Sequence, residues 1–325
     1  MRAVLCHQPG EIDTLRVEEI AAPALPEGGV RIDVRACGVN FADILLTRGE
    51  YQERPPHPFS PGLEAAGTVA EVAPGVTRCA PGDRVLAFLD HGGFAEQAIA
   101  REGDVHPIPQ GMDWATAATF PVVYATSHLA LRARARLQPG EVLLVHGASG
   151  GVGLTAVEVG AAVGATVIAS ASSPEKLAIA REHGATHLIN YAEEDIVERV
   201  RALTGGVDVV YDPVGGDSFE ASMHVINPGG RILVIGFASG TVPLIKANHL
   251  LVKDASALGL SLGQVRRHDP DAIAAAMREL FAWYLEGRVR PLVSQSFALD
   301  EAVEALRVLQ GRRATGKVAL LVDGS

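Results

Sequence analysis

The stretch VLLVHGASGGVGLTAVEVG, residues 142–160, places a glycine-rich loop between an apolar run and a long helical pattern. Gly147, Gly150 and Gly153 follow the spacing G-x-x-G-x-x-G. A loop that binds a dinucleotide needs such residues, because its backbone must turn tightly, approach a pyrophosphate and let the next helix pack closely on the strand. The first N–H groups of that helix then point at the phosphates. On its own the spacing is weak, since glycines also serve ordinary turns.

The chain after residue 140 alternates between short apolar runs and amphipathic helical patterns, which gives the loop its context. Continuous apolar runs separated by such helices indicate a parallel sheet that is covered on both faces. Right-handed crossovers determine most of its topology, and six strands make a complete dinucleotide-binding sheet. We expect strands at 141–146, 166–170, 187–190, 207–212, 231–236 and 256–260, and helices at 152–163, 174–183, 193–203 and 217–226.

The rest of the chain follows two other patterns. The first 110 residues contain short β segments broken by proline and glycine turns, which is typical of a barrel or a partly open sheet. The tail from residue 270 contains a long helix, a second helix and a final apolar strand, and it is short for a domain. We therefore expect an α/β protein in three parts. These are a β domain at 1–122, a doubly wound (Rossmann) domain with a six-stranded parallel sheet at 123–264, and a segment at 265–325 that returns to the β domain.

Composition excludes several classes of protein. The 325 residues are 48% apolar and 20% charged, which is typical of a well-packed globule. The formal net charge of −10 argues against a nucleic-acid-binding surface, because neutralising phosphates requires clustered lysine and arginine. No run of about 18 apolar residues avoids charge and glycine, and no signal peptide is visible, so we expect a cytoplasmic protein without a membrane span. Three dispersed cysteines suit a reducing compartment and exclude a four-cysteine zinc lobe.

The end of the second expected strand, IASASSPEK at residues 168–176, bears on the choice of dinucleotide. A site that prefers NAD usually places Asp or Glu about 20 residues after the loop, where it binds the ribose 2′-hydroxyl. Ser172 and Lys176 stand here instead, and hydroxyls with a cation suit a 2′-phosphate, so we expect NADP (NADPH). Glu175 counts against this expectation. In the alternative interpretation, Ser173 is only a helix N-cap and Lys176 a surface charge.

Further motifs occur in a fixed order along nearly the whole chain: ACGVNFADILLTRGEY (36–51), PGLEAAGTV (61–69), PGDRV (81–85), HGASGGVG (146–153), GATHLINY (184–191) and GKVAL (316–320). Together they resemble the zinc-free, zeta-crystallin-like quinone oxidoreductases of the medium-chain dehydrogenase/reductase superfamily. The resemblance implies a GroES-like N-terminal domain, a Rossmann domain and an active site in the cleft between them. It also implies a homodimer, because the apolar last strand, at 255–263, would be an exposed edge unless it pairs with its symmetry mate.

At two positions within these motifs, the residues differ from those of zinc-dependent members of the superfamily. Those members carry a ligand cysteine where this chain has Asn40 and a ligand histidine where it has Leu63. An amide is a poor zinc ligand and leucine has no lone pair, so we expect no metal. Reduction of a ketone leaves an alkoxide that zinc stabilises, whereas a quinone or an activated alkene spreads the charge over a conjugated system. We therefore expect a small quinone or a similar conjugated carbonyl compound as the substrate.

Carried over residue by residue, the resemblance assigns catalytic roles to Asn40 near the nicotinamide, Tyr51 over the substrate and Thr126 at the carboxamide. The resemblance also implies that Asp43 lies with Asn40 on the floor of the cleft, and we interpret Asp43 as structural rather than catalytic. Asn40 could instead be a turn cap, and Tyr51 plain surface. No general acid stands out, so catalysis would depend on positioning. The cofactor-binding set is Asn40, Thr126, Gly150, Gly151, Val152, Gly153, Ser172, Lys176, Tyr191, Phe237 and Lys317, the last of which would approach the phosphates.

Several functions remain open at this stage. The first hypothesis is an NADPH-dependent quinone reductase. The second is an NADPH-dependent reductase of enals or enoyl thioesters, which would share the fold, the cofactor and the metal-free cleft. Arg312 and Arg313 keep it open, because a thioester with a phosphorylated nucleotide tail needs a basic cleft. The third hypothesis is a non-catalytic NADPH-binding or structural protein, and the last is an alcohol dehydrogenase.

Overall fold

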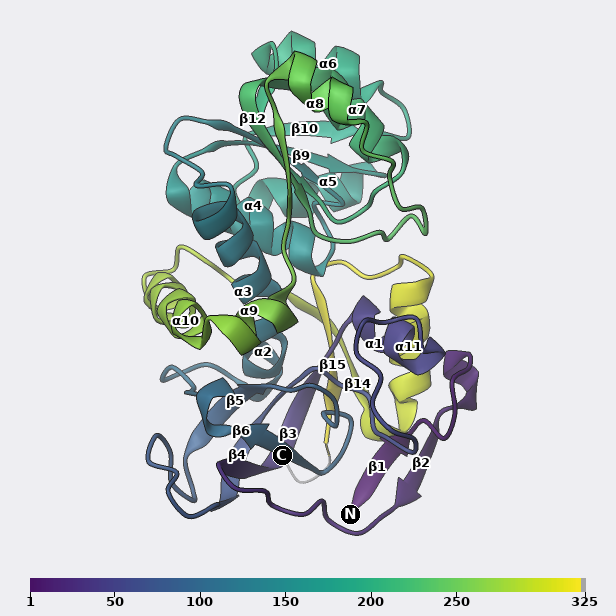
Figure 1. Ribbon diagram of the computed structural model, residues 1–325, viewed down its shortest axis with the longest axis vertical. Helices are drawn as coiled ribbons and strands as arrows, with labels where there is room; N and C mark the ends of the chain where they lie inside the picture. Colours follow the sequence, from purple (N-terminus) through teal and green to yellow (C-terminus); the bar gives the residue numbers. More distant parts are fainter. Residues whose placement is uncertain (323–325) are drawn as a thin grey trace. The chain divides into compact units, whose positions relative to one another are not determined.

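The computed structural model describes residues 1–322, and its chain divides into two compact units. The first unit comprises Met1–Val122 together with the chain from Pro291 onward, and the second comprises Val123–Arg290. Both are drawn in Figure 1, coloured along the sequence. Among residues 1–322, no helix is long and apolar enough to cross a membrane.

The second unit contains a six-stranded parallel sheet in the order β10–β9–β8–β11–β12–β13. The chain winds outward in one direction from β8 and in the other from β11, so the strand order reverses between these two neighbours. This is the doubly wound fold predicted from the alternating pattern. The strands are β8 Val142–His146, β9 Thr166–Ala171, β10 His187–Asn190, β11 Val207–Asp212, β12 Ile226–Val234 and β13 Ser256–Gly259; the helices between them are α4 Gly151–Val163, α5 Pro174–Glu182, α6 Ile196–Thr204, α7 Asp217–Val225 and α8 Ala247–Lys253.

Apolar side chains from neighbouring strands form the core of this sheet. Leu144 pairs with Ile168 on one side and with Val210 on the other, and Val210 in turn pairs with Ile232. All four side chains are fully buried. Because helices cover both faces of the sheet, its central strands have no alternating polar residues, which explains the continuous apolar runs.

Strand β12 begins earlier than the sequence pattern predicts. Ile226 already pairs with Val207, and the ladder resumes at Arg231 opposite Val209 after an irregularity. Gly229, with a φ of 76°, lies in the intervening segment. A stretch with the sequence NPGG is typical of a turn, but here it forms a bulge within a strand, so the expected start at 231 missed the first pair.

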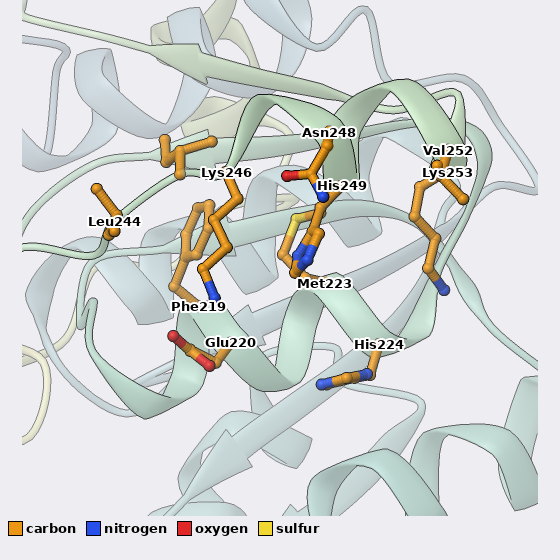
Figure 2. Close-up of a pocket in the computed structure, with 11 residues that line it drawn as sticks. Phe219, Glu220, Met223, His224, Leu244, Lys246, Asn248, His249, Val252 and Lys253 are labelled. Carbon is orange, nitrogen blue, oxygen red and sulfur yellow. The ribbon is translucent and has the colours of Figure 1, made fainter.

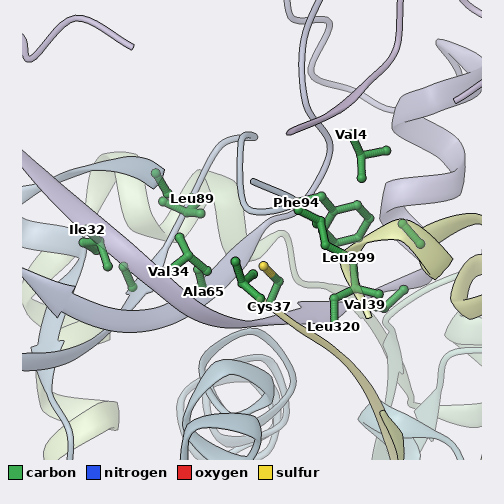
Figure 3. Close-up of a cluster of buried hydrophobic side chains, with 14 of the residues drawn as sticks. Val4, Ile32, Val34, Cys37, Val39, Ala65, Leu89, Phe94, Leu299 and Leu320 are labelled. Carbon is green, nitrogen blue, oxygen red and sulfur yellow. The ribbon is translucent and has the colours of Figure 1, made fainter. Parts of the chain in front are cut away.

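A seven-stranded sheet dominates the first unit, in the order β14–β15–β3–β4–β5–β7, with β6 also paired to β3. The long strand β3 pairs along one edge with β6 and β15 in succession and along the other edge with β4. Figure 3 shows part of the core, to which the C-terminal segment contributes Leu299 and Leu320. The elements are β3 Gly29–Val39, β4 Glu64–Val72, β5 Arg84–Phe88, β6 Gln97–Arg101, β7 Val105–Pro107, β14 Val293–Ala298 and β15 Lys317–Leu321, with helices α1 Phe41–Arg48, α2 Trp114–Thr119 and α11 Ala302–Gln310.

The segment expected to return as a whole from residue 265 divides between the two units, which corrects that boundary. Helices α9 (Leu262–His268) and α10 (Pro270–Leu285) belong to the second unit, and only the chain after them joins the sheet of the first. Helix α10 is held in the second unit because it buries Trp283 and because Glu279 Oε2 lies 2.7 Å from His128 Nε2. An amphipathic pattern shows that a helix packs on something, but it does not show on what.

Candidate functional site

The turn between β8 and α4 meets two steric demands that only glycine satisfies. Gly147 has a φ of 58°, which side chains disfavour. A Cβ on Gly153 would lie 2.1 Å from the Gly147 carbonyl oxygen, so helix α4 could not approach the strand as closely. A tight turn and close helix–strand packing are two of the three properties that a dinucleotide-binding loop requires.

Helix α4 supplies the third property, a bare amino end that an anion can approach. Its N-cap is Gly150, which has no side chain to cap the helix, and its first bond runs from the Leu154 N–H to the Gly150 carbonyl at 2.8 Å. The N–H groups of Gly151, Val152 and Gly153 precede that bond. Together with the positive end of the helix dipole, these groups form a backbone site suited to a pyrophosphate.

Three of the other expected cofactor residues follow the carboxyl ends of neighbouring strands. Ser172 comes directly after β9, Tyr191 directly after β10, and Phe237 lies in the loop after β12. The carboxyl ends of parallel strands share one edge of the sheet, and in this fold class ligands bind where the strand order reverses along that edge. The glycine loop occupies the same edge, since it follows β8.

Ser172 and Lys176 lie side by side at this edge, with Lys176 Nζ 3.4 Å from Ser172 Oγ. Ser173 is the N-cap of α5, and its Oγ accepts a hydrogen bond from the Lys176 N–H, as the capping alternative predicted. Glu175 is exposed, and a hydrogen bond from the Ser173 hydroxyl lowers the pKa of its carboxyl. The lower pKa keeps Glu175 ionised, so its charge still counts against a 2′-phosphate, although the hydrogen bond holds it at the helix cap. The Ser172 hydroxyl and the Lys176 ammonium lie together beside it.

The loop after β12 is anchored to the crossover that leaves β11. The Ala238 N–H donates to the Pro213 carbonyl at 3.0 Å, and the Ser239 N–H donates to the Val214 carbonyl at 2.9 Å. These bonds hold Phe237 with 39% of its surface exposed. The exposed ring of Phe237, on a fixed loop at the ligand edge, is a candidate contact for a planar group. Thr126, by contrast, is buried in helix α3 (Pro121–His128).

In the first unit, the polar side chains of Asn40, Asp43, Glu64 and Lys317 form a buried cluster, each at most 8% exposed. Lys317 Nζ lies 2.9 Å from the Val39 carbonyl oxygen, 2.6 Å from Asn40 Oδ1 and 2.8 Å from Glu64 Oε1. An ammonium group has three protons, so these three oxygens satisfy it completely. We call this arrangement the Lys317 cluster.

The Asn40 amide is oriented from both ends within the Lys317 cluster. Its Oδ1 accepts from Lys317, while its Nδ2 donates to Glu64 Oε1 at 2.9 Å. Glu64 Oε2 accepts from the Val122 N–H at 2.8 Å, so both carboxylate oxygens are bonded. Gly38 makes room for this carboxylate, because a Cβ at that position would lie 2.1 Å from Glu64 Oε1.

Asp43 stabilises the turn before helix α1 through hydrogen bonds to the backbone. Its Oδ2 accepts from the Asn40 N–H at 2.8 Å, and its Oδ1 accepts from the Gly62 N–H at 3.1 Å. Burial raises the pKa of Asp43 to about 7, although both backbone bonds and the charge of Lys317 act to lower it. The carboxyl bonds only backbone groups among these contacts, which supports the structural interpretation of this residue.

The structure changes what the sequence suggested for Lys317 and Tyr51. All three protons of Lys317 are engaged inside the first unit, so we no longer assign this lysine to the cofactor phosphates. Tyr51 is partly buried and packs on the core of the first unit, so it is not plain surface. The sequence does not predict the pairing of Lys317 with Glu64, because these residues are 253 positions apart and no local pattern links them.

A separate pocket of the second unit is lined by helix α7 and by residues 244–253 (Figure 2). Phe219 and Met223 supply apolar wall, and His224, His249 and Lys246 supply polar groups. None of the expected site residues lines this pocket. It therefore belongs to neither group of residues described above.

The donor groups of the first unit do not fit a zinc ion. Zinc in proteins is bound mainly by thiolate, imidazole and carboxylate groups in a tetrahedral arrangement. At Asn40 the donor is an amide, and the point between Asn40 Oδ1 and Glu64 Oε1 is taken by the Lys317 ammonium. No group of three or more His, Cys, Asp and Glu side chains within residues 1–322 is placed to hold a metal.

Family models match both units. Residues 26–110 match the alcohol dehydrogenase GroES-like domain, and residues 151–282 match the zinc-binding dehydrogenase family. The first match confirms the expected GroES-like β domain. The second covers five of the six strands of the parallel sheet and leaves out only β8.

Whole-chain comparisons find relatives of similar length. The chain is 40% identical over 324 residues to a quinone oxidoreductase-like protein 2 homolog of Nematostella vectensis, covering 98% of this chain and 88% of that protein. It is 30% identical to the quinone oxidoreductase of Homo sapiens, covering 99% and 98% of the two chains. The crystal structure of Escherichia coli quinone oxidoreductase complexed with NADPH superposes with a TM-score of 0.91 at 30% identity, covering 99% of this chain and 100% of that one.

Gly153→Ala should cost far more stability than Gly150→Ala. The added Cβ of the first variant meets a backbone oxygen at 2.1 Å, so the helix must shift, at a cost of about 2 kcal/mol or more. At Gly150 the nearest atom is 3.5 Å away and φ is −82°, so only the N-cap preference is lost, which costs about 1 kcal/mol or less. Thermal unfolding of both variants beside the parent measures the difference, and equal losses would contradict the close packing of helix and loop.

Proposed function

The chain belongs to the quinone oxidoreductase family of the medium-chain dehydrogenase/reductase superfamily, and from this premise we propose that it transfers a hydride from NADPH to quinones or similar conjugated carbonyl compounds. The observation that carries the proposal is the Lys317 cluster, whose oxygens surround an ammonium group instead of presenting zinc ligands. Without a Lewis acid at this point, an acceptor that delocalises its own negative charge is favoured over a simple ketone.

We assign the pyrophosphate of NADPH to the amino end of helix α4. The backbone N–H groups of Gly151, Val152 and Gly153 would donate to it, and no side chain at Gly150 obstructs the approach. Ser172 and Lys176, with Tyr191 beside them, would hold the adenosine 2′-phosphate through a hydroxyl and a cation. Thr126 and Phe237 would hold the nicotinamide end by a hydrogen bond and an aromatic face.

When bound, NADPH supplies the hydride that the reaction requires. The residues of the chain supply orientation and hydrogen bonds to the acceptor. The Asn40 amide uses one of its two Nδ2 hydrogens for the hydrogen bond to Glu64. We assign the second to a hydrogen bond with the oxygen of the acceptor. A donor that is already oriented stabilises the developing oxyanion without rearranging, and this is the main electrostatic contribution we assign to the protein. Tyr51 would cover the planar substrate.

Purified protein with NADPH and 1,4-benzoquinone should oxidise the cofactor, as measured by the loss of nicotinamide absorbance. A parallel reaction with a short enoyl thioester tests the alternative acceptor class, and Asn40→Ala should lower kcat with the quinone by about 100-fold, as for loss of an oxyanion-hole donor. Turnover of the thioester but of no quinone would replace the substrate class in our proposal. Binding of NADPH without reduction of any acceptor would support a non-catalytic protein instead.

Lys176→Ala should weaken binding of NADPH but not of NADH. Loss of one charge-assisted hydrogen bond to the 2′-phosphate, about 1.5–3 kcal/mol, corresponds to a roughly 10- to 100-fold rise in Kd. Arg181→Ala is the matched control, because this exposed cation lies on the same helix α5. Fluorescence titration gives all the dissociation constants. Equal weakening of both cofactors by Lys176→Ala, or equal effects of the two variants on NADPH, would count against our assignment of the phosphate.

We also propose that two copies of the chain form a homodimer along strand β13. This strand ends the parallel sheet, so one of its edges has no partner strand among residues 1–322. Nearby helix α8 exposes Leu251 and Val252 by 82% and 83%, and Leu244 in the preceding loop is 77% exposed. Large apolar side chains exposed this closely together are typical of a protein interface. A second copy that adds its own β13 would cover both the edge and these side chains.

Leu251→Asp and Val252→Asp, combined in one variant, should convert this dimer to monomer because two charges would be buried in an apolar interface. Leu285→Asp is the control, since Leu285 is 66% exposed at the end of α10, away from α8 in sequence. Sedimentation equilibrium over a range of concentrations reports the mass of each. A monomer mass for the unmodified protein at every concentration would exclude the dimer.

A further inference from the structure

We infer that the Lys317 ammonium is the resident cation of the buried cluster: it fills the point between the Val39, Asn40 and Glu64 oxygens, which would otherwise suit a metal ion, and it orients the Asn40 amide. Lys317 is then a positioning residue rather than a catalytic one, because it would act on the substrate only through Asn40. The catalytic part of this inference rests on the proposed function, while the part that concerns cations does not.

The geometry around Lys317 Nζ is that of a small coordination shell. Its three acceptors come from different elements: Val39 from the end of β3, Asn40 from the N-cap of α1, and Glu64 from the start of β4. The three distances lie between 2.6 and 2.9 Å. The side chain of Glu64 is fully buried and that of Lys317 is 7% exposed, so solvent screens neither charge well.

The charges of this shell explain why the chain needs a cation there. Among residues 1–322, Glu64 is the one carboxylate that bonds Lys317 directly, and removing either partner would leave an uncompensated charge in the interior. Carboxylate, amide and backbone carbonyl oxygens are also the ligands that Ca²⁺ and Mn²⁺ prefer. The oxygens thus suit a hard cation, but the ammonium is covalently attached to β15 and would have to be displaced before an ion could enter.

The same ammonium determines which way the Asn40 amide faces. Lysine can only donate, so the atom of the amide that faces Lys317 must be the oxygen. The nitrogen must then face Glu64 Oε1, which accepts from it at 2.9 Å. The Glu64 carboxylate can only accept, so it requires the same orientation of the amide, and the two charged groups hold Asn40 from both ends. Lys317, together with Glu64, therefore fixes the donor that we assign to the substrate oxygen.

Three proteins test the inference: the unmodified chain, Lys317→Met, and the double variant Lys317→Met/Glu64→Gln. Methionine keeps a linear side chain without charge, and the glutamine removes the carboxylate while keeping its shape. Thermal unfolding of each protein, alone and with millimolar Ca²⁺ or Mn²⁺, shows whether the vacated point accepts an ion. We expect Lys317→Met to gain roughly 5 °C from the metal, while the unmodified protein and the double variant gain nothing.

Each outcome of these unfolding experiments either supports or overturns the inference. If Lys317→Met is unfolded without metal, recovery of a cooperative transition on addition of Ca²⁺ supports the inference. A metal response equal to that of the double variant, or no recovery, overturns the claim that the ammonium stands at a cation position. This arm needs neither cofactor nor turnover, so it remains decisive even if the protein reduces no quinone.

The positioning role is tested by kinetics on the double variant, which lacks both buried charges. With NADPH and a quinone, we expect kcat to fall about 10-fold while the Kd for NADPH, measured by fluorescence, stays within about 2-fold. A merely structural pair would leave kcat unchanged in a double variant that unfolds at the temperature of the parent. Unchanged kcat in such a protein would overturn the positioning role, and a matching loss of NADPH affinity would show that Lys317 serves the cofactor instead.

Discussion

The buried ion pair between Lys317 and Glu64 is the interaction on which the first unit and its candidate chemistry depend. The two groups lie 2.8 Å apart with almost no access to solvent, and each would be costly to bury alone. The pair also joins β15, near the end of the chain, to β4, and it orients the Asn40 amide between them. Gly38 is required beneath the carboxylate, so even the backbone of β3 is adapted to this contact.

The sequence predicted most of the second unit, because the signals there are local. Continuous apolar runs, helix periodicity and the spacing of Gly147, Gly150 and Gly153 each extend over fewer than twenty residues. The start of β12 was missed, because a turn-like sequence can also form a bulge. Helix α10 was assigned to the wrong unit, because amphipathicity does not specify the surface against which a helix packs.

In the candidate site, too, the sequence predicted the features that depend on local signals and not the contact that depends on distant ones. The glycine loop, Ser172 and Lys176 were placed at one edge of the sheet by strand order alone, and the structure adds that Glu175 is tied to the cap of α5. The partner of Lys317 could not be predicted, because the contact spans 253 positions and depends on how β15 aligns with β3. A lysine in a short motif near a presumed cofactor site suggests a phosphate ligand, whereas burial and three oxygen partners indicate an internal counter-ion.

The pairing of β15 with β3 has a consequence for how the protein is made. On the ribosome, residues 123–290 emerge as one uninterrupted segment and can fold as soon as they are complete, since domains fold as units during synthesis. The sheet of the other unit must wait for its last strands, although its first residues were translated earliest. Until Lys317 leaves the exit tunnel, the nascent chain carries Glu64 without its counter-charge, so a truncated product would keep an incomplete sheet for chaperones or proteases to recognise.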